Sequence, residues 1–576
     1  MKSHLITAAT IAFSQLLISD STLAESNHTN NLNKAGASIA TVGSDNACDF
    51  RTGINKIQDA LNSNNDYTEI RVANNQTYLE NINIVNRSIT IRGGFADCND
   101  AAANIQNLSS RTTLEGTAQR AVVKIASDDA TQHLVSIENI ILTGGGGQDG
   151  EIEVGGIGAF DVNLVLFLNR VDIGGNESDF AGGGINIFNS ANTSSHLVAT
   201  DVRLQGNQGV RGGGIYCSGI NNEITIEGAS GIYLNSAVNG GGVYLENGCE
   251  FNMYSGVDFT HNSNYYDGIV DNQADENGGG LFISSGAQAN FNSNKRCINF
   301  AFGTCLAFAG SQSSTTNISY NAANIRGGGI YMTGNESTVS MDTGVINSNS
   351  AVSEGGGIYA SEGARFDMFW QADDANYLYQ TCALLGTCSV LFGNNADYGG
   401  AVYLATGAQA SLLRTHVTNN IGFDYGSAAY VRDEDSVLKI EGSVVTQNGN
   451  GSSNYIINTY NGHNSTVALQ VQNTTFADNQ SASQLLSSTN SAINISSSII
   501  SEPNISSIYD GDNSFATFDC VVVNENNSLQ GTTMFDVVVD DPEFVDRFND
   551  DYHIDPINSP AVDLCDSATS SDKFDV

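Results

Sequence analysis

A glycine-rich motif that recurs along the middle of the chain constrains the fold more than any other feature. It reads Gly-Gly-small, then an aliphatic residue and usually an aromatic one, as in GGGIYC from Gly212 and GGGVYL from Gly240. The copies start at Gly155, Gly182, Gly212, Gly240, Gly278, Gly327, Gly355, Gly399 and Gly426. The shortest intervals define a unit of 27 to 30 residues, and the longer intervals indicate insertions within a unit. A repeat of this length predicts a solenoid.

A second marker keeps phase with the glycine motif. An apolar-x-x-Asn tetrad precedes each following glycine motif by five or six residues, and it ends at Asn176, Asn207, Asn235, Asn272, Asn321, Asn349, Asn394 and Asn420. Between the markers lie short stretches of alternating apolar and polar residues, such as Asn222 to Ile226, which are typical of strands. Helical periodicity is nearly absent. We therefore predict an all-β, right-handed parallel β-helix, in which each coil stacks on the next about 4.8 Å away.

The use of Gly, Asn and Pro agrees with stacked coils. Glycine suits positions where the backbone turns with positive φ or where neighbouring coils leave no room for a Cβ. Asparagine at a constant corner tolerates left-handed geometry, and stacked Asn side chains can form hydrogen-bonded ladders. Proline would remove a hydrogen bond between coils. The first 502 residues contain none, and the four prolines are Pro503, Pro542, Pro556 and Pro560.

The repeat and its flanks define the expected domain organisation. Phe50, Ile54, Ile57 and Leu61 share one helical face, so we expect a short capping helix within an N-terminal cap at residues 42–66. Three short strands follow, Glu69 to Val72, Ile82 to Ile84 and Ser88 to Ile91. The β-helix would occupy residues 67–500, with insertions at 260–277, 286–318 and 361–393. Residues 501–576 would hold the last coils and a closing segment.

The N-terminus and the charge predict an exported protein. Residues 1–24 have the features of a signal peptide, namely Lys2, an apolar run from Leu5 to Ile18 and a small-residue cleavage site ending at Ala24. Residues 25–41 would then be a linker. The net charge of −40 argues against nucleic acid and against anionic membrane surfaces as partners. No other apolar run is long enough for a membrane helix, so we expect a monomer that is secreted or held at the cell surface, in association with an outer membrane.

The cysteines agree with export. They are Cys48, Cys98, Cys217, Cys249, Cys297, Cys305, Cys382, Cys388, Cys520 and Cys565. Pairing neighbours would give five local disulfides, among them Cys48 to Cys98 between the cap and the first coil, but the sequence leaves the connectivity open. Zinc sites use CxxC spacing or nearby histidines, and neither accompanies these cysteines.

The chain resembles exported bacterial proteins of the pectate-lyase-like β-helix superfamily. The N-terminal pattern, the coils and the C-terminal segments DPEFV from Asp541, DYHI from Asp551 and SPAVD from Ser559 carry the resemblance over residues 42 to 566. The coupled Asn and GGGIY units are also similar to the repeats of polymorphic outer-membrane proteins. Such chains usually continue past the SPAVD segment, so we expect a truncated C-terminus. The superfamily includes lyases, hydrolases, adhesins and secreted passengers, so the resemblance leaves the function open.

No catalytic set is evident from the sequence. A pectate-lyase activity would imply Ca²⁺ and an Arg or Lys base, but Lys295, Arg296, Arg326 and Arg365 lie in no recognisable carboxylate cluster. A glycosidase needs two carboxylates about 5 to 10 Å apart. The adjacent acid pairs, such as Asp373 and Asp374, lack the accompanying His and Arg-x-Lys elements of β-helical polygalacturonases. Exposed acid pairs are more often solvated loop residues.

Metal binding has only faint support. Asp510 and Asp512 supply oxygen ligands in a tight turn, as Ca²⁺ sites do, although a turn without a metal is the favoured explanation. Asp267 and Asp271, in the expected insertion at 260–277, form the other place where Ca²⁺ could bind. Calcium is the only cofactor that the sequence leaves open.

Two insertions give the best indication of function. Residues 286–318 and 361–393 each follow a glycine-motif strand, so they would leave the same corner of coils that are separated by one intervening coil. Their aromatic residues include Phe300, Phe302, Phe369, Trp370, Tyr377 and Tyr379. Aromatic side chains on loops over a rigid scaffold are a common recognition arrangement; alternatively, these rings only cover the side of the solenoid.

These observations favour a binding protein over an enzyme. We predict an adhesin-like or glycan-binding element at the cell surface or outside the cell, whose partner would be a polysaccharide or the surface of a host or neighbouring cell. The alternative is a polysaccharide lyase or glycoside hydrolase of the same superfamily. The sequence identifies no catalytic residue for this alternative.

Overall fold

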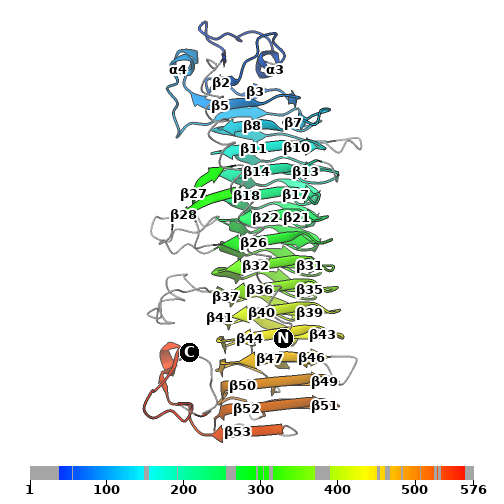
Figure 1. Ribbon diagram of the computed structural model, residues 1–576, viewed down its shortest axis with the longest axis vertical. Helices are drawn as coiled ribbons and strands as arrows, with labels where there is room; N and C mark the ends of the chain where they lie inside the picture. The colour runs from blue at the N-terminus through cyan, green and yellow to red at the C-terminus, as the bar shows by residue number, and fades with distance from the viewer. Residues whose placement is uncertain are drawn as a thin grey trace, which may run out of the picture.

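The chain forms a right-handed parallel β-helix that is drawn out along one axis (Figure 1). The computed structural model describes residues 38–564, except residues 55, 148–154, 191–192, 255–267, 293–295, 302–303, 310–315, 370–388, 451–453, 461–466, 482–483, 506, 525–528, 530–532 and 563. The expected signal peptide at 1–24 and most of the expected linker therefore lie outside the described residues. Among the described helices, none is long and apolar enough to cross a membrane.

One coil illustrates the repeat. The chain runs through β18 (Glu223–Glu227), β19 (Gly231–Tyr233), β20 (Ser236–Asn239) and β21 (Val243–Glu246), and then β22 (Glu250–Met253) stacks on β18 in parallel register. The strands that stack on β18 form what we call the first face, and those that stack on β19 form the second face; both belong to one 30-stranded sheet. Strands equivalent to β20 form a 7-stranded sheet, and those equivalent to β21 form a 14-stranded sheet.

The glycine motif lies where the chain enters the 14-stranded sheet. The strands that follow it are β10 (Ile157–Phe160), β13 (Ile185–Phe188), β17 (Ile215–Ser218), β21, β25 (Leu281–Ile283), β31 (Ile330–Thr333), β35 (Ile358–Ser361), β39 (Val402–Leu404) and β43 (Ala429–Arg432). Gly212 has a φ of +69°. A Cβ at Gly213 would lie 2.5 Å from the carbonyl oxygens of Gly241 and Ser236, which belong to the next coil. Glycine is thus used in this motif both for positive φ and because neighbouring coils leave no room for a Cβ, as expected.

The Asn markers form a buried hydrogen-bonded ladder. In each coil the Asn side-chain amide donates to Oδ1 of the Asn in the next coil, at 2.9 to 3.0 Å. The ladder starts at Asn176 and continues past Asn420 through Asn448 and Asn479. The expectation that these asparagines themselves adopt left-handed geometry is wrong. The residue before each Asn has positive φ instead, for example Leu234 (+55°) before Asn235, because the chain turns there and leaves Asn free to point inward.

Alternate residues of the strands fill a continuous apolar core. Ile215, Cys217, Ile224 and Ile226 are fully buried and repeat coil after coil. On the other side of the 14-stranded sheet, the aromatic residues of the motif stack on one another in what we call the inner stack. It comprises Tyr216, Tyr244, Phe282, Tyr331, Tyr359, Tyr403 and Tyr430, with ring centroids 4.4 to 5.8 Å apart. Aromatic contacts therefore add to the stacking of the coils.

The N-terminal cap contains a shorter helix than expected. α3 runs over Lys56–Leu61 and buries Ile57 and Leu61 against the first coils, but Ile54 is 82% exposed. Gly53 has a φ of +91°, so the helix cannot extend back through it. β1 (Ile39–Val42) begins in the segment expected to be linker and ends at the first residue of the expected cap, and it pairs with β2 (Glu69–Ala73). The expected strands are present as β2, β4 (Ile82–Val85) and β5 (Ile89–Phe95).

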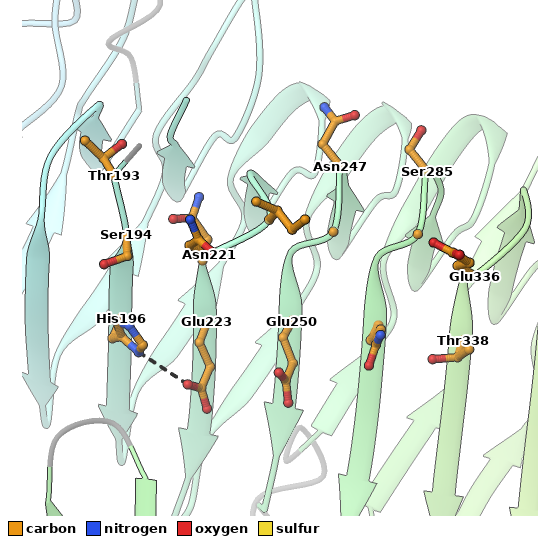
Figure 2. A pocket seen from close by; sticks show the side chains of 15 residues that line it. Thr193, Ser194, His196, Asn221, Glu223, Asn247, Glu250, Ser285, Glu336 and Thr338 are labelled. Atoms are coloured by element: carbon orange, nitrogen blue, oxygen red, sulfur yellow. Dashed lines mark ion pairs between the residues drawn. The ribbon is translucent and has the colours of Figure 1, made fainter. Parts of the chain in front are cut away.

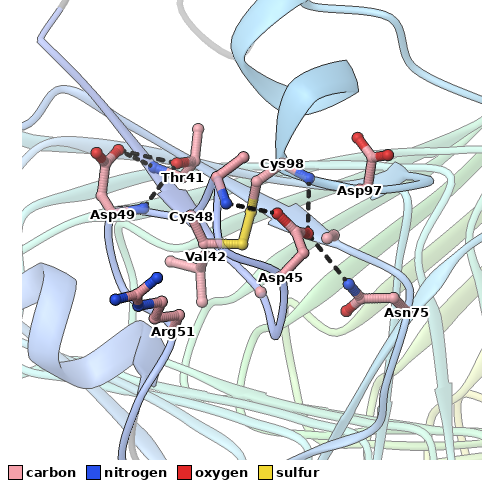
Figure 3. Close-up of a disulfide and its surroundings, with 12 residues drawn as sticks. Thr41, Val42, Asp45, Cys48, Asp49, Arg51, Asn75, Asp97 and Cys98 are labelled. Carbon is pink, nitrogen blue, oxygen red and sulfur yellow. Dashed lines mark hydrogen bonds between the residues drawn. A yellow bond between two sulfur atoms is a disulfide. The ribbon is translucent and has the colours of Figure 1, made fainter.

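Two of the expected disulfides are present. Cys48 pairs with Cys98 at the start of α4 (Cys98–Ala103), and Asp45 accepts a hydrogen bond from the amide of Cys98 beside this bridge (Figure 3). Cys217 pairs with Cys249 inside the core. Cys520 is also disulfide-bonded. Cys297 and Cys305 lie in β27 (Arg296–Ala301) and β28 (Thr304–Ala309), while Cys382, Cys388 and Cys565 lie outside the described residues.

The last coils end in a segment that folds back. After β50 (Ala492–Ser501), β51 (Tyr509–Asp512), β52 (Phe515–Val523) and β53 (Thr533–Val539), an antiparallel pair forms from β54 (Phe544–Asp546) and β55 (Asp551–Ile554). Arg547, in the short 3-10 helix between them, makes a bidentate ion pair with Asp478 and donates to Ser501. The expected closing segment is thus fastened to earlier coils.

Candidate functional site

Outward side chains of the first face form a polar row across five coils. The strands are β14 (Ser195–Thr200), β18, β22, β26 (Gln288–Asn292) and β32 (Thr338–Asp342). Their register places five residues side by side, one per coil: His196, Glu223, Glu250, Gln288 and Thr338. Because side chains alternate across a strand, the residues two positions later, such as Asn252 and Asn290, also face outward and form a second row.

This row is the floor of a groove of about 980 Å³ (Figure 2). One wall consists of the turns that enter the first face, and they contribute Thr193, Asn221, Asn247, Ser285 and Glu336. Most of the lining side chains carry hydroxyl, amide or carboxylate groups, and Ile220 is the apolar exception. The groove runs along the axis of the solenoid, so it can accommodate an extended chain rather than a compact molecule.

Two glutamates meet at the centre of the groove. Nδ2 of Asn252 lies 3.1 Å from Oε1 of Glu223 and 3.1 Å from Oε1 of Glu250. The two oxygens can therefore be no farther apart than twice this distance, about 6.2 Å. Asn290 donates to Oδ1 of Asn252 at 3.0 Å and to Oε1 of Glu250 at 3.4 Å. Asn252 is 5% exposed, so a buried amide holds both carboxylates in place.

The electrostatic environment of the groove is acidic. Nδ1 of His196 lies 3.3 Å from Oε2 of Glu223, which makes an ion pair when the imidazole is protonated. Glu223, Glu250 and Glu336 are the carboxylates of the lining, and His196 is its only basic side chain. Burial, and next the charges of Glu223 and Glu250, raise the pKa of Tyr254, which follows β22. An anionic ligand would therefore be repelled unless a cation came with it.

Three long connections follow strands of this face and start at its far edge. They connect β22 to β23 (Gly268–Val270), β26 to β29 (Thr316–Ser319), and β36 (Arg365–Phe369) to β37 (Ser389–Phe392). The last two come from coils separated by the single coil of β32, as expected. Residues 268–277, which we expected within an insertion, instead form β23 and β24 (Gln273–Asn277) of the regular stack.

The structure describes only part of the predicted aromatic site. Phe369 ends β36 and is partly exposed, and Phe300 lies in β27, which pairs with β28. Phe302, Trp370, Tyr377 and Tyr379 lie outside the described residues. The joint aromatic surface therefore stays a prediction.

The predicted Ca²⁺ sites at Asp510 and Asp512 and at Asp267 and Asp271 stay predictions. Asp510 and Asp512 lie on β51, where the Tyr455 hydroxyl donates to Asp510 at 3.4 Å. Asp271 is a corner residue between β23 and β24 with a φ of +54°, and Asp267 lies outside the described residues. Two groups of three ligand-type side chains do occur, at Asp45 with Cys48 and Cys98, and at Asp519 with Cys520 and Asp536. Their cysteines are disulfide-bonded and so cannot act as thiolate ligands.

The groove residues were not predicted from the sequence, although the repeat spacing could have indicated two of them. Glu223 and Glu250 are 27 residues apart, which is one repeat unit, and each starts a strand. The same phase that relates successive glycine motifs therefore places these two acids side by side. A search for acids adjacent in sequence could not find them, because the solenoid brings together residues one unit apart.

Comparisons with known proteins found similar solved structures but no matching sequence. No family model and no curated protein matches the chain. Among solved structures, two mutants of the tailspike protein of Escherichia coli bacteriophage HK620, each in complex with a pentasaccharide, are similar to it. One shares 12% identity with a TM-score of 0.27, and the other 11% with a TM-score of 0.24. Each alignment covers 84% of this chain and 74% of the tailspike chain. The resemblance to pectate-lyase-like and polymorphic outer-membrane proteins stays a prediction.

Proposed function

We propose that the groove over β14 to β32 binds a segment of a polysaccharide, and that the protein does so outside the cell or at its surface. The in-register row of Glu, Asn, Gln and Thr side chains carries this proposal. Carboxylates accept hydrogen bonds and amides both donate and accept, so the row matches the alternating donor and acceptor character of sugar hydroxyls. Asn252 and Asn290 hold the two central carboxylates before a ligand arrives, which lowers the entropy cost of binding.

The charge of the groove favours neutral or amino-bearing sugars. Three carboxylates face one histidine in the lining, and the whole chain carries a net charge of −40. A polyuronate is anionic, so the groove carboxylates would repel it at short range and the net charge of the chain would repel it at longer range. The aromatic residues of the loops, from Phe300 to Tyr379, would form the second wall of this binding surface.

A glycan array followed by calorimetry with the best ligand tests the proposal. Replacing Glu250→Gln removes one charge at the centre of the groove, and Asn252→Ala removes the amide that holds both glutamates. We expect each change to weaken binding about tenfold or more, as for the loss of a charged or bridging hydrogen bond. Glu115→Gln is the matched control, because Glu115 is exposed and lies outside the groove. Equal affinity of the wild type, both groove variants and the control would contradict the proposal.

A second candidate function is glycoside hydrolysis. It rests on the proximity of Glu223 and Glu250, since retaining glycosidases place two carboxyl groups about 5 to 5.5 Å apart. One carboxyl would attack the anomeric carbon while the other protonates the leaving oxygen, and water would then release the sugar. Incubation with glycans that bind should produce new reducing ends. Both Glu223→Gln and Glu250→Gln should abolish this activity, and at least one of the two variants should still bind the glycan. Binding without new reducing ends would leave the protein a binding element alone.

A further inference from the structure

A second column of aromatic rings lies away from the groove, at the junction of the 7-stranded and 14-stranded sheets. Tyr398 of β38 (Asn395–Tyr398), Tyr425 of β42 (Ile421–Tyr425) and Tyr455 of β46 (Tyr455–Tyr460) form this outer stack. Their ring centroids are 6.0 and 5.9 Å apart, and the ring planes are within 17° of parallel. Unlike the inner stack it is open to solvent, because Tyr425 is 37% exposed and the neighbouring Phe423 is 51% exposed.

Carboxylates accompany the outer stack. Asp397 and Asp424 precede the two tyrosines on adjacent strands, and Asp510 lies 3.4 Å from the hydroxyl of Tyr455. Partial burial, and next the charge of Asp424, raise the pKa of Asp397. A hydrogen bond to Asp424 and partial burial raise the pKa of Tyr398. Asp397 and Asp424 therefore lie close enough to repel each other, and no ion pair with either of them occurs in the described part of the chain.

The inner stack shows how this fold satisfies the same combination of groups. Arg211 lies over the ring of Tyr244, 5.9 Å from its centroid, and 3.5 Å from Glu246. Arg326 repeats the arrangement, 5.4 Å from the ring centroid of Tyr359 and 2.6 Å from Glu354. In both places a guanidinium lies against an aromatic ring and is paired with a carboxylate.

The outer stack has the rings and the carboxylates but not the cation. The charged groups that shift the pKa of Tyr398 and of Asp397 are acids. Within the described part of the chain, no arginine or lysine makes an ion pair with Asp397, Asp424 or Asp510, and none lies over the rings of Tyr398, Tyr425 or Tyr455. Tyr398 pairs with Glu354 in the column that also holds Arg326, and its ring packs edge-on against Tyr430 of the inner stack at 5.8 Å. A ring thus takes the place of the guanidinium there, while the carboxylates beside it have no cationic partner among the described residues.

We propose that the outer stack is a docking surface for a polypeptide that presents an arginine side chain. The guanidinium would lie against the exposed ring of Tyr425 and pair with Asp424, as Arg326 does with Tyr359 and Glu354. Arginine suits the site better than lysine, because its planar group stacks on rings and pairs with a carboxylate in fixed geometry. Tyrosine and arginine also contribute disproportionately to protein interfaces. The net charge of −40 attracts such a basic partner at longer range.

The test measures peptide binding to the full chain at physiological salt. A fluorescently labelled peptide of alternating arginine and glycine is titrated with the wild type and with the double variant Asp424→Asn, Tyr425→Ala, and anisotropy is followed. We expect the double variant to bind at least about fivefold more weakly, as for the loss of one ring contact and one charged partner. The matching lysine peptide should bind the wild type more weakly than the arginine peptide.

The control separates the outer stack from the general acidity of the surface. Asp275→Asn removes an exposed charge from β24 of the same sheet, away from the tyrosines, and should leave the affinity for the arginine peptide nearly unchanged. The proposal is overturned if the double variant binds as the wild type or as Asp275→Asn does. Equal binding of the lysine and arginine peptides would overturn the assignment of a guanidinium. Unchanged thermal unfolding of each variant confirms that the comparison is between folded proteins.

Discussion

A single buried carboxylate terminates the asparagine ladder. Glu502 is fully buried and accepts hydrogen bonds from the backbone amide of Asn479 at 2.8 Å and from its side-chain amide at 2.6 Å. It takes the place that the next Asn would occupy. Burial outweighs these hydrogen bonds and raises the pKa of Glu502 to about 8. The residue is therefore neutral in the folded protein at a pH where an exposed glutamate is charged.

The raised pKa makes stability depend on pH. Between its ordinary pKa of about 4.3 and about 8, Glu502 holds a proton in the folded chain that the unfolded chain lacks. The free energy of unfolding therefore falls as pH rises through this window, by up to about 1.4 kcal/mol per pH unit. Glu502→Gln cannot titrate, so its stability relative to the wild type should rise from about pH 5 to about pH 8 and then level off. Denaturant unfolding at a series of pH values measures this difference.

A matched variant identifies the source of the pH dependence. Glu115→Gln changes an exposed carboxyl to an amide, and its stability relative to the wild type should show a much smaller dependence on pH over the same range. If the Glu502→Gln difference is as flat as that of Glu115→Gln, Glu502 is not the protonated group.

At the residue scale, sequence periodicity predicts where a residue lies in the coil better than it predicts what that residue does. The apolar-x-x-Asn spacing predicted the ladder, and the same tetrads at Asn448 and Asn479 continue it where the glycine motif has been lost. Glu502 could not be predicted as its end, because a glutamate breaks the pattern that defines the ladder. Its role follows only from burial and from the two donors of Asn479.

At the scale of elements, one corner of the coil accepts long loops. Strands of the first face keep their register across β22, β26, β32 and β36 although the connections that follow them differ widely in length. Hydrogen bonds between coils fix the strands, so a loop at the corner costs mainly its own closure entropy, which grows slowly with length. The strands of the first face and the connections that follow them can therefore vary independently in sequence.

The loops should contribute to binding rather than to stability. Trp370 follows β36 directly, and Trp370→Ala should reduce the affinity for the bound glycan about tenfold, as loss of an aromatic contact at a binding site does. The thermal midpoint should change little. Phe180→Ala, at a 45% exposed ring elsewhere, is the matched control. Unchanged affinity in Trp370→Ala would mean that the loops only cover the side of the solenoid.

The groove itself was hidden from sequence reasoning for a physical reason. Its centre is formed by residues one coil apart, Glu223 and Glu250, and by Asn252, which an outward position would normally expose. The insertions follow strands of the same face and leave from its edge. Which outward side chains form the floor depended on register, and register is visible only once the strands are aligned.

At the scale of the whole molecule, export is the prediction with the simplest test. The disulfides Cys48 to Cys98 and Cys217 to Cys249 are compatible with an oxidising compartment, and residues 1–24 have the pattern of a signal peptide. Mass spectrometry of the protein recovered outside the cytoplasm should find an N-terminus at Glu25. A variant with charged residues in the run from Leu5 to Ile18 should stay uncleaved in the cytoplasm. Recovery of uncleaved Met1 outside the cytoplasm would contradict the assigned cleavage site.

The asparagine ladder also produces a net dipole along the axis of the solenoid. From Asn176 to Asn479 each side-chain amide donates to the next member of the ladder on its C-terminal side and also to a backbone carbonyl of the preceding coil, while Oδ1 accepts from the N-terminal side. All the Oδ1 atoms therefore face the N-terminal end, so the amide dipoles point the same way and add, as peptide dipoles do along an α-helix. The negative end is Oδ1 of Asn176, which accepts from the amide of Gly145. The positive end meets Glu502. This column of side chains therefore resembles an α-helix with an acidic residue at its N-terminus. It differs in that it is built from side chains and lies beside an apolar core.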